Sequence, residues 1–332
     1  MKALRRAGWA VSVVPEWEYI PLKWGAFSMR ALGRLIRPVA VREFNKALIS
    51  EVCQSRADMF LSFKGMFVTA EAVKVIRAQG CFAYCFFPDN SFFAHGPWLP
   101  HALPEYDWVY SAKSFGLRDL REQLGMERTS LLLHGFDPDL HRPLELTPAD
   151  LDEFEADVSF IGTWSPKKER YLAVLATSRP DLRLRIWGAY WDKARSQPLK
   201  KVVRAARPLL GDSYVRAICA SKINLGILSE RRKRSSADDQ ITSRTFHIPA
   251  SGGFLLHERT PEVLNVLKEN VEIGCFGDEE EIVAAVEHWL EQPSQRVAVA
   301  EAGYQAVVAS HSWDQRIGVI LRDHAHRRDR VV

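Results

Sequence analysis

Short apolar segments alternate with amphipathic segments along most of the chain, and this alternation limits the fold more than any other feature. Strands are predicted at 11–14, 59–63, 81–87, 108–111, 131–133, 158–161, 182–187, 223–227, 254–256 and 271–275. Helices are predicted at 2–10, 24–36, 41–55, 70–79, 113–124, 167–177, 214–220, 242–250, 278–290, 293–310 and 312–325. A strand followed by a helix and then another strand gives a parallel sheet. The sequence therefore predicts an α/β protein with doubly wound parallel sheets.

The length of 332 residues is enough for two domains. We predict an N-terminal domain at 1–143, an acidic, proline-containing linker at 144–156, and a C-terminal domain at 157–310. The final segment, 311–332, is predicted to be a helix that crosses back to the first domain. With 47% hydrophobic and 26% charged residues, the chain is globular rather than disordered.

Composition also limits the partners and the compartment. The five cysteines are scattered and odd in number, which favours free thiols in a reducing cytosol. A net charge of +4 permits an anionic ligand or a membrane surface but does not require nucleic acid. No nucleic-acid-binding signature, apolar span or signal peptide is visible in the sequence. We expect a cytoplasmic protein that does not bind nucleic acid.

The predicted helix at Trp24–Ile36 is basic and amphipathic, and Pro38 is expected to end it. The simpler interpretation is a helix that covers a sheet. The alternative is an interfacial helix that contacts the inner face of the membrane and brings the protein to a lipid-linked acceptor.

Polar residues follow three predicted strands of the N-terminal domain. They are Lys64-Gly65, Asp89-Asn90 and His134-Gly135. Ligands of doubly wound sheets bind beyond the carboxyl ends of the strands. We therefore expect these three groups to meet at one edge of the sheet and to form a ligand site.

The stretch from 235 to 258 carries the strongest candidate site. Ser243 lies near the start of a predicted helix, whose unpaired N–H groups suit a phosphate. Arg244 adds a planar fork of donors that matches phosphate oxygens. Gly252 and Gly253 carry no side chain that would keep a ligand from the backbone. The alternative is an ordinary helix, a glycine cap and a strand.

Several loose motifs together resemble the CgeB-like (spore-maturation-type) glycosyltransferases, which belong with the group-1 glycosyltransferases of GT-B fold. The resemblance covers nearly the whole chain. In chain order the motifs are Phe63-Lys64-Gly65, Phe87-Pro88-Asp89-Asn90, Tyr106-Asp107-Trp108-Val109, His134-Gly135-Phe136-Asp137, Val158–Gly162 with Arg170, Ile186-Trp187-Gly188, Ser243–Leu256, and His311-Ser312-Trp313 with Arg316.

This resemblance implies two Rossmann-like domains that face a cleft. The C-terminal domain would bind a nucleotide-sugar co-substrate, and the N-terminal domain would bind the acceptor, with no other cofactor and no metal. The implied donor-binding residues are Gly162, Thr163, Arg170, Gly188, Asp239, Ser243, Arg244, His247, Gly252, Gly253 and Glu258. The implied acceptor-side residues are Lys64, Gly65, Asp89, Asn90 and His134.

Within this set, Gly162 and Arg244 would lie near the diphosphate, and Arg244 would stabilise the charge on the leaving nucleotide. His247 stands where the family usually has a glutamate that holds the ribose. A neutral imidazole offers one donor and one acceptor, whereas a carboxylate accepts from both hydroxyls. Asp239 has the spacing of an acidic residue that touches the donor sugar, although Asp238 is an equal candidate. Glu258 follows a strand, where the simpler interpretation is a surface charge.

A second departure lies at the start of the chain. Rossmann-like domains open with a strand and a glycine turn, whereas this sequence opens with residues that predict a helix. We therefore expect the first strand of the N-terminal domain to be missing.

The resemblance implies a retaining, metal-independent glycosyltransferase that acts on a nucleoside-diphosphate sugar and a hydroxyl acceptor. The acceptor would be a glycan, a lipid-linked molecule or a protein. An inverting reaction would need a base, for which Asp89 and His134 are the candidates. The competing hypothesis is a non-catalytic nucleotide-sugar-binding or scaffold protein.

Overall fold

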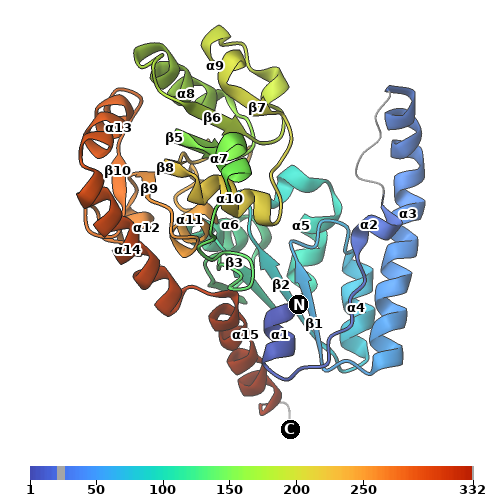
Figure 1. Cartoon of the computed structure of the whole chain (residues 1–332). Helices are drawn as coiled ribbons and strands as arrows, with labels where there is room; N and C mark the ends of the chain where they lie inside the picture. The colour runs from blue at the N-terminus through green and yellow to red at the C-terminus, as the bar shows by residue number, and fades with distance from the viewer. Residues whose placement is uncertain (21–26, 331–332) are drawn as a thin grey trace. The chain divides into compact units, whose positions relative to one another are not determined.

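The computed structural model describes the backbone of residues 1–20 and 27–330, and the side chains of 1–20 and 36–330. Within these residues the chain forms two compact units, drawn in Figure 1. Unit 1 comprises Met1–Leu133, Arg231–Ala237 and Ile317–Val332. Unit 2 comprises His134–Glu230 and Asp238–Arg316. Each unit is built around a parallel sheet, as the alternation of strands and helices predicts.

Unit 1 contains a four-stranded sheet in the order β1-β2-β3-β4, with every pair parallel. Its strands are β1 (Met59–Phe63), β2 (Phe82–Phe87), β3 (Trp108–Ser111) and β4 (Thr129–Leu131). Its helices are α1 (Lys2–Arg6), α2 (Glu16–Tyr19), α3 (Phe27–Ser55), α4 (Ala70–Ala78), η1 (Phe92–His95), α5 (Trp98–Ala102), η2 (Leu103–Glu105) and α6 (Ser114–Leu124). Thr69 caps α4, because its side chain accepts a hydrogen bond from the Ala72 N–H.

Two predictions for the start of unit 1 are wrong. Residues 11–14 form no strand. Helix α3 continues through Pro38 rather than ending there. The proline removes one helical hydrogen bond, but the helix beyond it buries an apolar face, formed by Val41, Phe44, Leu48 and Val52. Packing of this face offsets the lost bond. The amphipathic face expected within 24–36 lies largely outside the residues whose side chains are described.

The last helix, α15 (Trp313–Arg328), packs against the sheet of unit 1 through polar side chains. The Tyr110 hydroxyl donates to Asp323 Oδ2 at 2.8 Å. The Tyr84 hydroxyl lies 3.1 Å from His324 Nδ1. The guanidinium of Arg327 lies over the Trp108 ring, 4.0 Å from its centroid. Unit 1 is therefore assembled from segments at both ends of the sequence.

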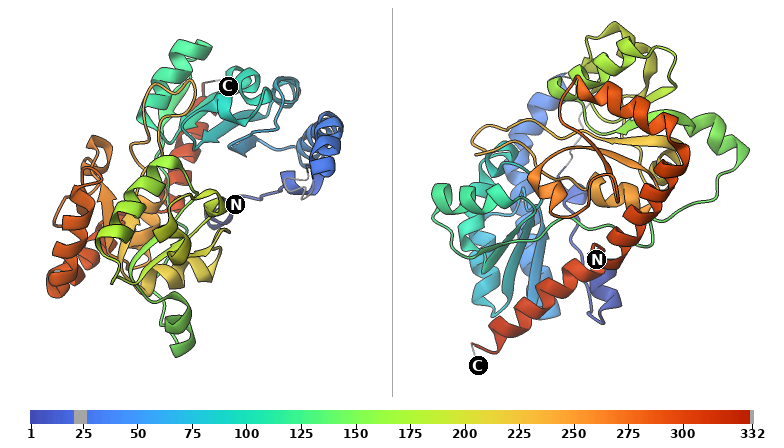
Figure 2. Two further views of the ribbon diagram at one scale, coloured as in Figure 1. Left: turned by 90° about the horizontal axis from the view of Figure 1, so that it is seen from above. Right: turned by 90° about the vertical axis from the view of Figure 1, so that its left-hand side faces the viewer.

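Unit 2 contains a six-stranded sheet in the order β10-β9-β8-β5-β6-β7. Figure 2 shows the ribbon from two further sides. From β5 the chain proceeds outward through β6 and β7, and it then returns to the other side of β5 with β8. The strand order therefore reverses between β5 and β8, which pair with Val158 opposite Ile223. The strands are β5 (Ala156–Ile161), β6 (Leu184–Trp187), β7 (Val203–Ala205), β8 (Ser221–Gly226), β9 (Leu255–Glu258) and β10 (Gly274–Phe276).

The helices of unit 2 are α7 (Pro148–Phe154), α8 (Pro166–Ser178), η3 (Trp191–Lys193), α9 (Gln197–Val202), α10 (Asp212–Cys219), α11 (Arg244–Ala250), α12 (Pro261–Leu264), α13 (Glu281–Glu291) and α14 (Pro293–Ser310). The core of the unit buries Phe160, Ile186, Ile223, Leu256 and Phe276 between the sheet and these helices. These side chains come from five of the six strands, so burial of the sheet faces holds the unit together.

The segment expected as a linker, 144–156, is largely ordered structure within unit 2. It contains α7, where Thr147 and Asp150 form a reciprocal capping box. Phe154 is buried against Trp187, with their ring centroids 6.2 Å apart. The prolines at 143 and 148 suggested a linker, but Pro148 stands in the first turn of α7, where a missing N–H costs nothing.

Two further observations bear on the predicted environment. All five cysteines are free, as the sequence predicts, and Cys85 in β2 and Cys81 just before it are buried. Among the described residues, no helix is both long and apolar enough to cross a membrane.

Candidate functional site

The best candidate site lies in unit 2, at the carboxyl ends of β5 and β8. These are the two strands between which the strand order reverses. In open parallel sheets a crevice forms at this point, because the connections from the two strands diverge to opposite faces. Gly162 follows β5, and Ile227 follows β8. A ligand at this position would therefore meet backbone from both connections.

Arg244, the first residue of α11, reaches the same point. Its Nη2 donates to the Ile227 carbonyl at 2.8 Å, and its guanidinium lies 5.3 Å from the Phe160 ring centroid. Its Nε is buried and has no hydrogen-bond partner among the described residues. The carbonyl and the ring fix the guanidinium in place, and the Nε–H donor remains without an acceptor among the described residues. This is the arrangement that a phosphate would complete.

The glycine loops after β5 and β6 pack directly on one another. A Cβ at Gly162 would lie 2.9 Å from Arg244 Nη1 and 2.8 Å from the Phe160 ring. Gly188 has φ +147°, and a Cβ there would lie 2.0 Å from the Gly162 carbonyl oxygen. The Gly162 carbonyl also accepts a bond from Trp191 Nε1 at 2.8 Å. Gly162 and Gly188 are therefore required for the close approach of the two loops and the guanidinium.

Two lysines at the start of α8 add positive charge beside the β5 and β8 ends. Lys168 is buried, and its Nζ donates to Ser229 Oγ at 2.9 Å and to the Thr163 carbonyl at 3.3 Å. Lys167 Nζ lies 2.5 Å from Glu258 Oε1, with both side chains mostly buried. Lysine ammonium groups bind phosphate as point charges. Together with Arg244, they provide three cations around the switch point.

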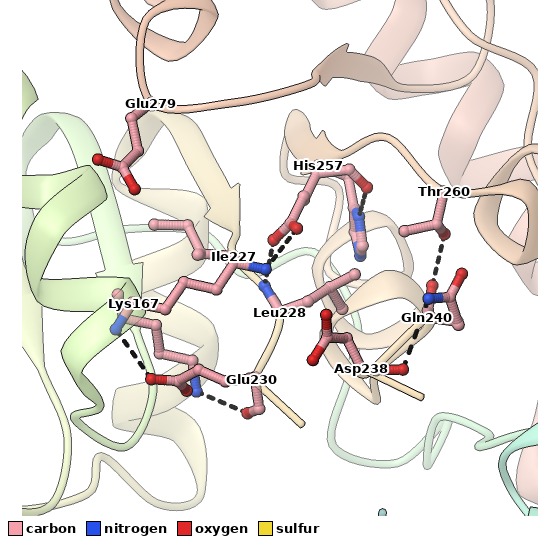
Figure 3. Close-up of polar contacts among 12 residues, drawn as sticks. Lys167, Ile227, Leu228, Glu230, Asp238, Gln240, His257, Thr260 and Glu279 are labelled. Atoms are coloured by element: carbon pink, nitrogen blue, oxygen red, sulfur yellow. Dashed lines mark hydrogen bonds and ion pairs between the residues drawn. The ribbon is translucent and has the colours of Figure 1, made fainter. Parts of the chain in front are cut away.

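Acidic side chains hold Lys167 in place, and the close-up in Figure 3 labels Lys167 together with Glu230. Glu258 Oε2 accepts from the Leu228 N–H at 3.0 Å, while its other oxygen holds Lys167. Glu230 Oε1 accepts from the Lys167 N–H at 2.9 Å. Glu258 is therefore not a surface charge, which was the simpler interpretation from sequence. It connects the end of β9 to α8 and to the segment after β8.

The structure separates the two adjacent aspartates that the sequence left equivalent. Asp239 is buried, whereas Asp238 is exposed. The Asp239 N–H donates to the Ser229 carbonyl at 3.2 Å, which holds the residue beside the segment after β8. Burial lowers the pKa of Arg244, and the nearby charge of Asp239 acts in the opposite direction. Asp239 is therefore the aspartate that lies within electrostatic reach of Arg244.

His247 lies one turn further along α11 and is held by other parts of unit 2. Its ring stacks on His141, with centroids 3.9 Å apart and an interplanar angle of 17°. Its Nε2 lies 3.3 Å from the Gly135 carbonyl oxygen. Burial, followed by the charges of His141 and His134, lowers the pKa of His247 well below its usual range. His247 is therefore neutral at pH 7.

This histidine cluster predicts a loss of stability in mild acid. Burial lowers the pKa of His141 to about 4, and burial also lowers that of His311 to about 4. Above pH 6.5 neither the folded nor the unfolded chain protonates these rings, so their contribution to stability is complete. Between about pH 6.5 and 4 only the unfolded chain takes up the protons, and the free energy of unfolding falls. For His141 the slope is up to about 1.4 kcal/mol per pH unit.

Urea unfolding at pH 7, 5.5 and 4.5 measures this slope. The values of pH 7 and 5.5 lie above the range in which most carboxylates titrate, so the histidines dominate the change between these two values. The variant His141→Phe keeps an aromatic ring in the stack and removes one titrating group. We expect it to show a shallower slope than the unchanged chain. A free energy of unfolding that stays constant from pH 7 to 4.5 would contradict the prediction.

The remaining residues of the predicted donor site make other contacts in unit 2. Ser243 precedes α11, but its side chain makes no capping hydrogen bond. Gly252 and Gly253 follow the opposite end of α11. A Cβ at Gly253 would lie 2.5 Å from Ile218, so this glycine packs against protein rather than opening a path to a ligand. Arg170 is exposed and pairs with Glu279 at 2.9 Å. Thr163 contributes its carbonyl oxygen to Lys168.

The predicted acceptor-side residues divide between the two units. Lys64 follows β1 and Asp89 follows β2, and their charged atoms lie 2.6 Å apart in unit 1. His95, which sequence reasoning missed, places its Nε2 2.7 Å from the same Asp89 oxygen. Asn90 is half-buried beside Asp89, and Gly65 packs against Ser62 and Tyr106. His134 belongs to unit 2, where its carbonyl accepts from Arg316 Nε at 3.2 Å.

The environment of Asp89 makes it a weak base. Burial by itself would raise its pKa, but the hydrogen bond from His95 and the charge of Lys64 outweigh burial. Together they hold the pKa of Asp89 well below its usual range. A carboxylate with so low a pKa has little tendency to accept a proton at neutral pH.

Sequence reasoning missed the two lysines at the start of α8, as well as Ser229, Glu230 and His141. One signal was available for the lysines. They follow Ser165 and Pro166, shortly after the end of β5. A serine that caps a helix, followed by proline, is a typical signal for the start of a helix. The partners of these lysines lie 61 and 91 residues away in sequence, and no local pattern indicates them.

Comparisons with known proteins agree with this architecture. Residues 167–322 match the protein family described as "Glycosyl transferase-like". This segment includes the lysines of α8, Asp239, Arg244 and Glu258. No curated protein sequence matches the chain.

Several solved structures resemble most of the chain at low sequence identity. A glycosyltransferase from Rickettsia africae matches with a TM-score of 0.62 and 11% identity, over 87% of this chain and 82% of the other. Sucrose-phosphate synthase from Thermosynechococcus elongatus matches with a TM-score of 0.62 and 13% identity, over 92% and 82%. The Anabaena protein HepE, solved in complex with UDP, matches with a TM-score of 0.60 and 13% identity, over 88% and 84%. The chain shares the fold of these solved structures, which is the GT-B fold.

Proposed function

We propose that this protein is a glycosyltransferase that moves a sugar from a nucleoside-diphosphate sugar to a hydroxyl acceptor. The position of Arg244 carries the proposal. Its guanidinium lies at the switch point of the unit 2 sheet, beside Gly162, with a buried Nε that has no partner among the described residues. The match of residues 167–322 to the glycosyl transferase-like family supports the same function.

In this reaction the bond between the anomeric carbon and the diphosphate oxygen breaks, and the acceptor oxygen bonds to the anomeric carbon. The acceptor proton leaves with the nucleoside diphosphate, on which negative charge develops. Arg244 and the two lysines of α8 would stabilise that charge, because cations fixed in a desolvated site need no reorganisation as it develops. Asp239 would contact the donor sugar, and His247 would face the ribose.

We further propose that the enzyme retains the configuration of the anomeric carbon and belongs to the CgeB-like group. The resemblance to group-1 glycosyltransferases supports retention. The low pKa of Asp89 also counts against an inverting reaction that uses this residue as its base. His134 is the remaining candidate base from the sequence. The stereochemistry of the product, read by proton NMR of the new glycosidic bond, tests this point.

The donor panel should begin with UDP-glucose, because HepE from Anabaena has been solved in complex with it. We propose a cytoplasmic enzyme, with an acceptor hydroxyl on a glycan, a lipid-linked molecule or a protein. The primary test incubates the purified chain with a panel of nucleotide-sugars and measures release of the nucleoside diphosphate. Slow hydrolysis of one donor, above a heat-treated control, supports the transferase.

A non-catalytic nucleotide-sugar-binding protein is the second candidate. The contacts of the His247 ring with other protein groups favour it. This ring is stacked on His141 and lies close to the Gly135 carbonyl, so one face and one nitrogen are already engaged by protein. A carboxylate at this position would accept from both ribose hydroxyls. Binding of a nucleotide-sugar by thermal shift, without turnover of any donor, would select this candidate.

We expect turnover to survive chelation, since three side-chain cations already surround the proposed diphosphate site. Incubation with EDTA should leave the rate of nucleotide release within about twofold of the untreated rate, because arginine and lysine supply the charge that a divalent ion would otherwise provide. The control is the same preparation with added magnesium or manganese. Complete loss of turnover in EDTA, restored by manganese, would contradict the metal-independent proposal.

A further inference from the structure

A pocket lies entirely within unit 1, whereas the proposed donor site belongs to unit 2. It is formed where Arg231–Ala237, the segment between β8 and α11, packs against α6 and η1 of unit 1. Its volume is about 400 Å³, which is within the range of about 300–1,000 Å³ typical of small-molecule sites. Neither the family resemblance nor the proposed donor site includes this pocket.

Hydrogen bonds to unit 1 fix the wall made by this segment. Ser91 Oγ donates to the Lys233 carbonyl at 2.9 Å, and Gln123 Nε2 donates to the Arg234 carbonyl at 2.8 Å. The Ser236 N–H donates to Asp119 Oδ2 at 3.0 Å. The guanidinium of Arg234 also lies over the Phe93 ring, 4.4 Å from its centroid. The basic run at 231–234 is therefore anchored to unit 1 and is not a loosely solvated loop.

The pocket contains buried polar atoms that make no hydrogen bond to the described residues of the protein. Asp119 on α6 is only 2% exposed, and its Oδ1 has no hydrogen-bond partner among the described residues. On the facing wall, the Ser236 hydroxyl oxygen is also buried and has no hydrogen-bond partner among the described residues. Both residues line the pocket. A buried carboxylate oxygen without a partner is costly, and a donor group from a ligand would remove that cost.

The charges that line the pocket determine which ligand fits. Asp119 and Glu122 supply two carboxylates, and Arg231 and Arg234 supply two guanidinium groups. An anion would meet the carboxylates, and a cation would meet the guanidiniums. A hydroxyl group can donate to a carboxylate and accept from a guanidinium at once. The balanced charges favour an uncharged ligand with many hydroxyl groups.

We propose that this pocket binds a neutral sugar residue. A hydroxyl of the sugar donates to Asp119 Oδ1, while neighbouring hydroxyls exchange hydrogen bonds with Glu122 and the two arginines. Binding at this pocket does not depend on the proposed transfer reaction. Its use as a subsite for a glycan acceptor rests on the proposed function.

Saturation-transfer NMR on the full chain tests the proposal. The probes are glucose, galactose and N-acetylglucosamine, with glucuronate and glucosamine as charged comparisons. We expect saturable binding of at least one neutral sugar at millimolar concentration and weaker binding of both charged sugars. The Asp119→Asn variant should bind at least about tenfold more weakly, because a bond to a charged acceptor is lost. Glu122→Gln, on the pocket rim, should weaken binding by a smaller factor.

Glu127→Gln is the matched control. This exposed carboxylate pairs with Arg121 just beyond α6 and lies outside the pocket lining. It should bind the sugar as the unchanged chain does. Donor hydrolysis should be the same in Asp119→Asn as in the unchanged chain, so loss of sugar binding is distinguishable from failure of the transferase proposal. The proposal is overturned if no neutral sugar binds, if charged sugars bind equally well, or if both pocket variants retain full affinity.

Discussion

Replacing Arg244 with alanine is expected to lower the rate of nucleotide-sugar turnover by about 100- to 1,000-fold, the usual effect of removing one donor from a site of developing charge. The loss should appear mainly in kcat, because the charge on the leaving diphosphate is greatest in the transition state. Arg244→Lys should also lose at least about tenfold, since an ammonium cannot reproduce the planar fork. The measurement is nucleoside diphosphate release under saturating donor.

Arg183→Ala serves as the matched control for this experiment. Arg183 belongs to the same unit, is exposed, and pairs with Glu155. Its loss should leave turnover unchanged and stability within about 0.5 kcal/mol of the unchanged chain. Turnover of Arg244→Ala within a few-fold of the unchanged rate, with a normal melting curve, would show that Arg244 is not part of the donor site.

The second large effect concerns stability. Gly188→Ala is expected to reduce the free energy of unfolding by about 3 kcal/mol, from backbone strain and from overpacking. Its φ of +147° disfavours any side chain, and the new Cβ would lie 2.0 Å from the Gly162 carbonyl oxygen. The two glycine loops would have to separate, which would also displace the backbone beside Arg244. Urea unfolding measures the loss, and donor binding by thermal shift measures the displacement.

Gly125→Ala separates strain from overpacking. Gly125 also has a positive φ, +67°, but a Cβ there would meet nothing within 4 Å. Its cost should be only about 1 kcal/mol, the penalty of a left-handed conformation. Equal losses for the two variants would show that contact between the loops after β5 and β6 contributes nothing to stability.

Local patterns in the sequence predicted most helices and strands. Helix α14 has the predicted bounds, Pro293–Ser310, because a proline start and a continuous run of helix-forming residues mark it. Strand β4 was predicted at 131–133 and lies at Thr129–Leu131, since the apolar leucines drew the prediction past the paired residues. Strand β7, Val203–Ala205, was missed because three residues with a central arginine carry no periodic signal.

The candidate site was only partly predictable, for a physical reason. Arg244 and Gly162 could be identified because their residue types suit a phosphate and their positions follow expected elements. The pairing of Lys167 with Glu258 depends on tertiary packing of α8 against the end of β9. The same holds for the stack of His141 on His247, which joins segments about a hundred residues apart. Contacts of this kind become visible only once the sheet is assembled.

The composition of unit 1 from segments at both ends of the sequence has a consequence for biosynthesis. The ribosome releases the strands of this sheet before most of unit 2, and it releases most of α15 after unit 2. Until Asp323 and His324 emerge, the hydroxyls of Tyr110 and Tyr84 lack these partners, and the part of the sheet that α15 contacts stays exposed. Chaperones that shield exposed apolar surface would have to hold unit 1 while all of unit 2 is translated. Nascent chains arrested before residue 317 should therefore remain protease-sensitive in unit 1 although unit 2 is nearly complete.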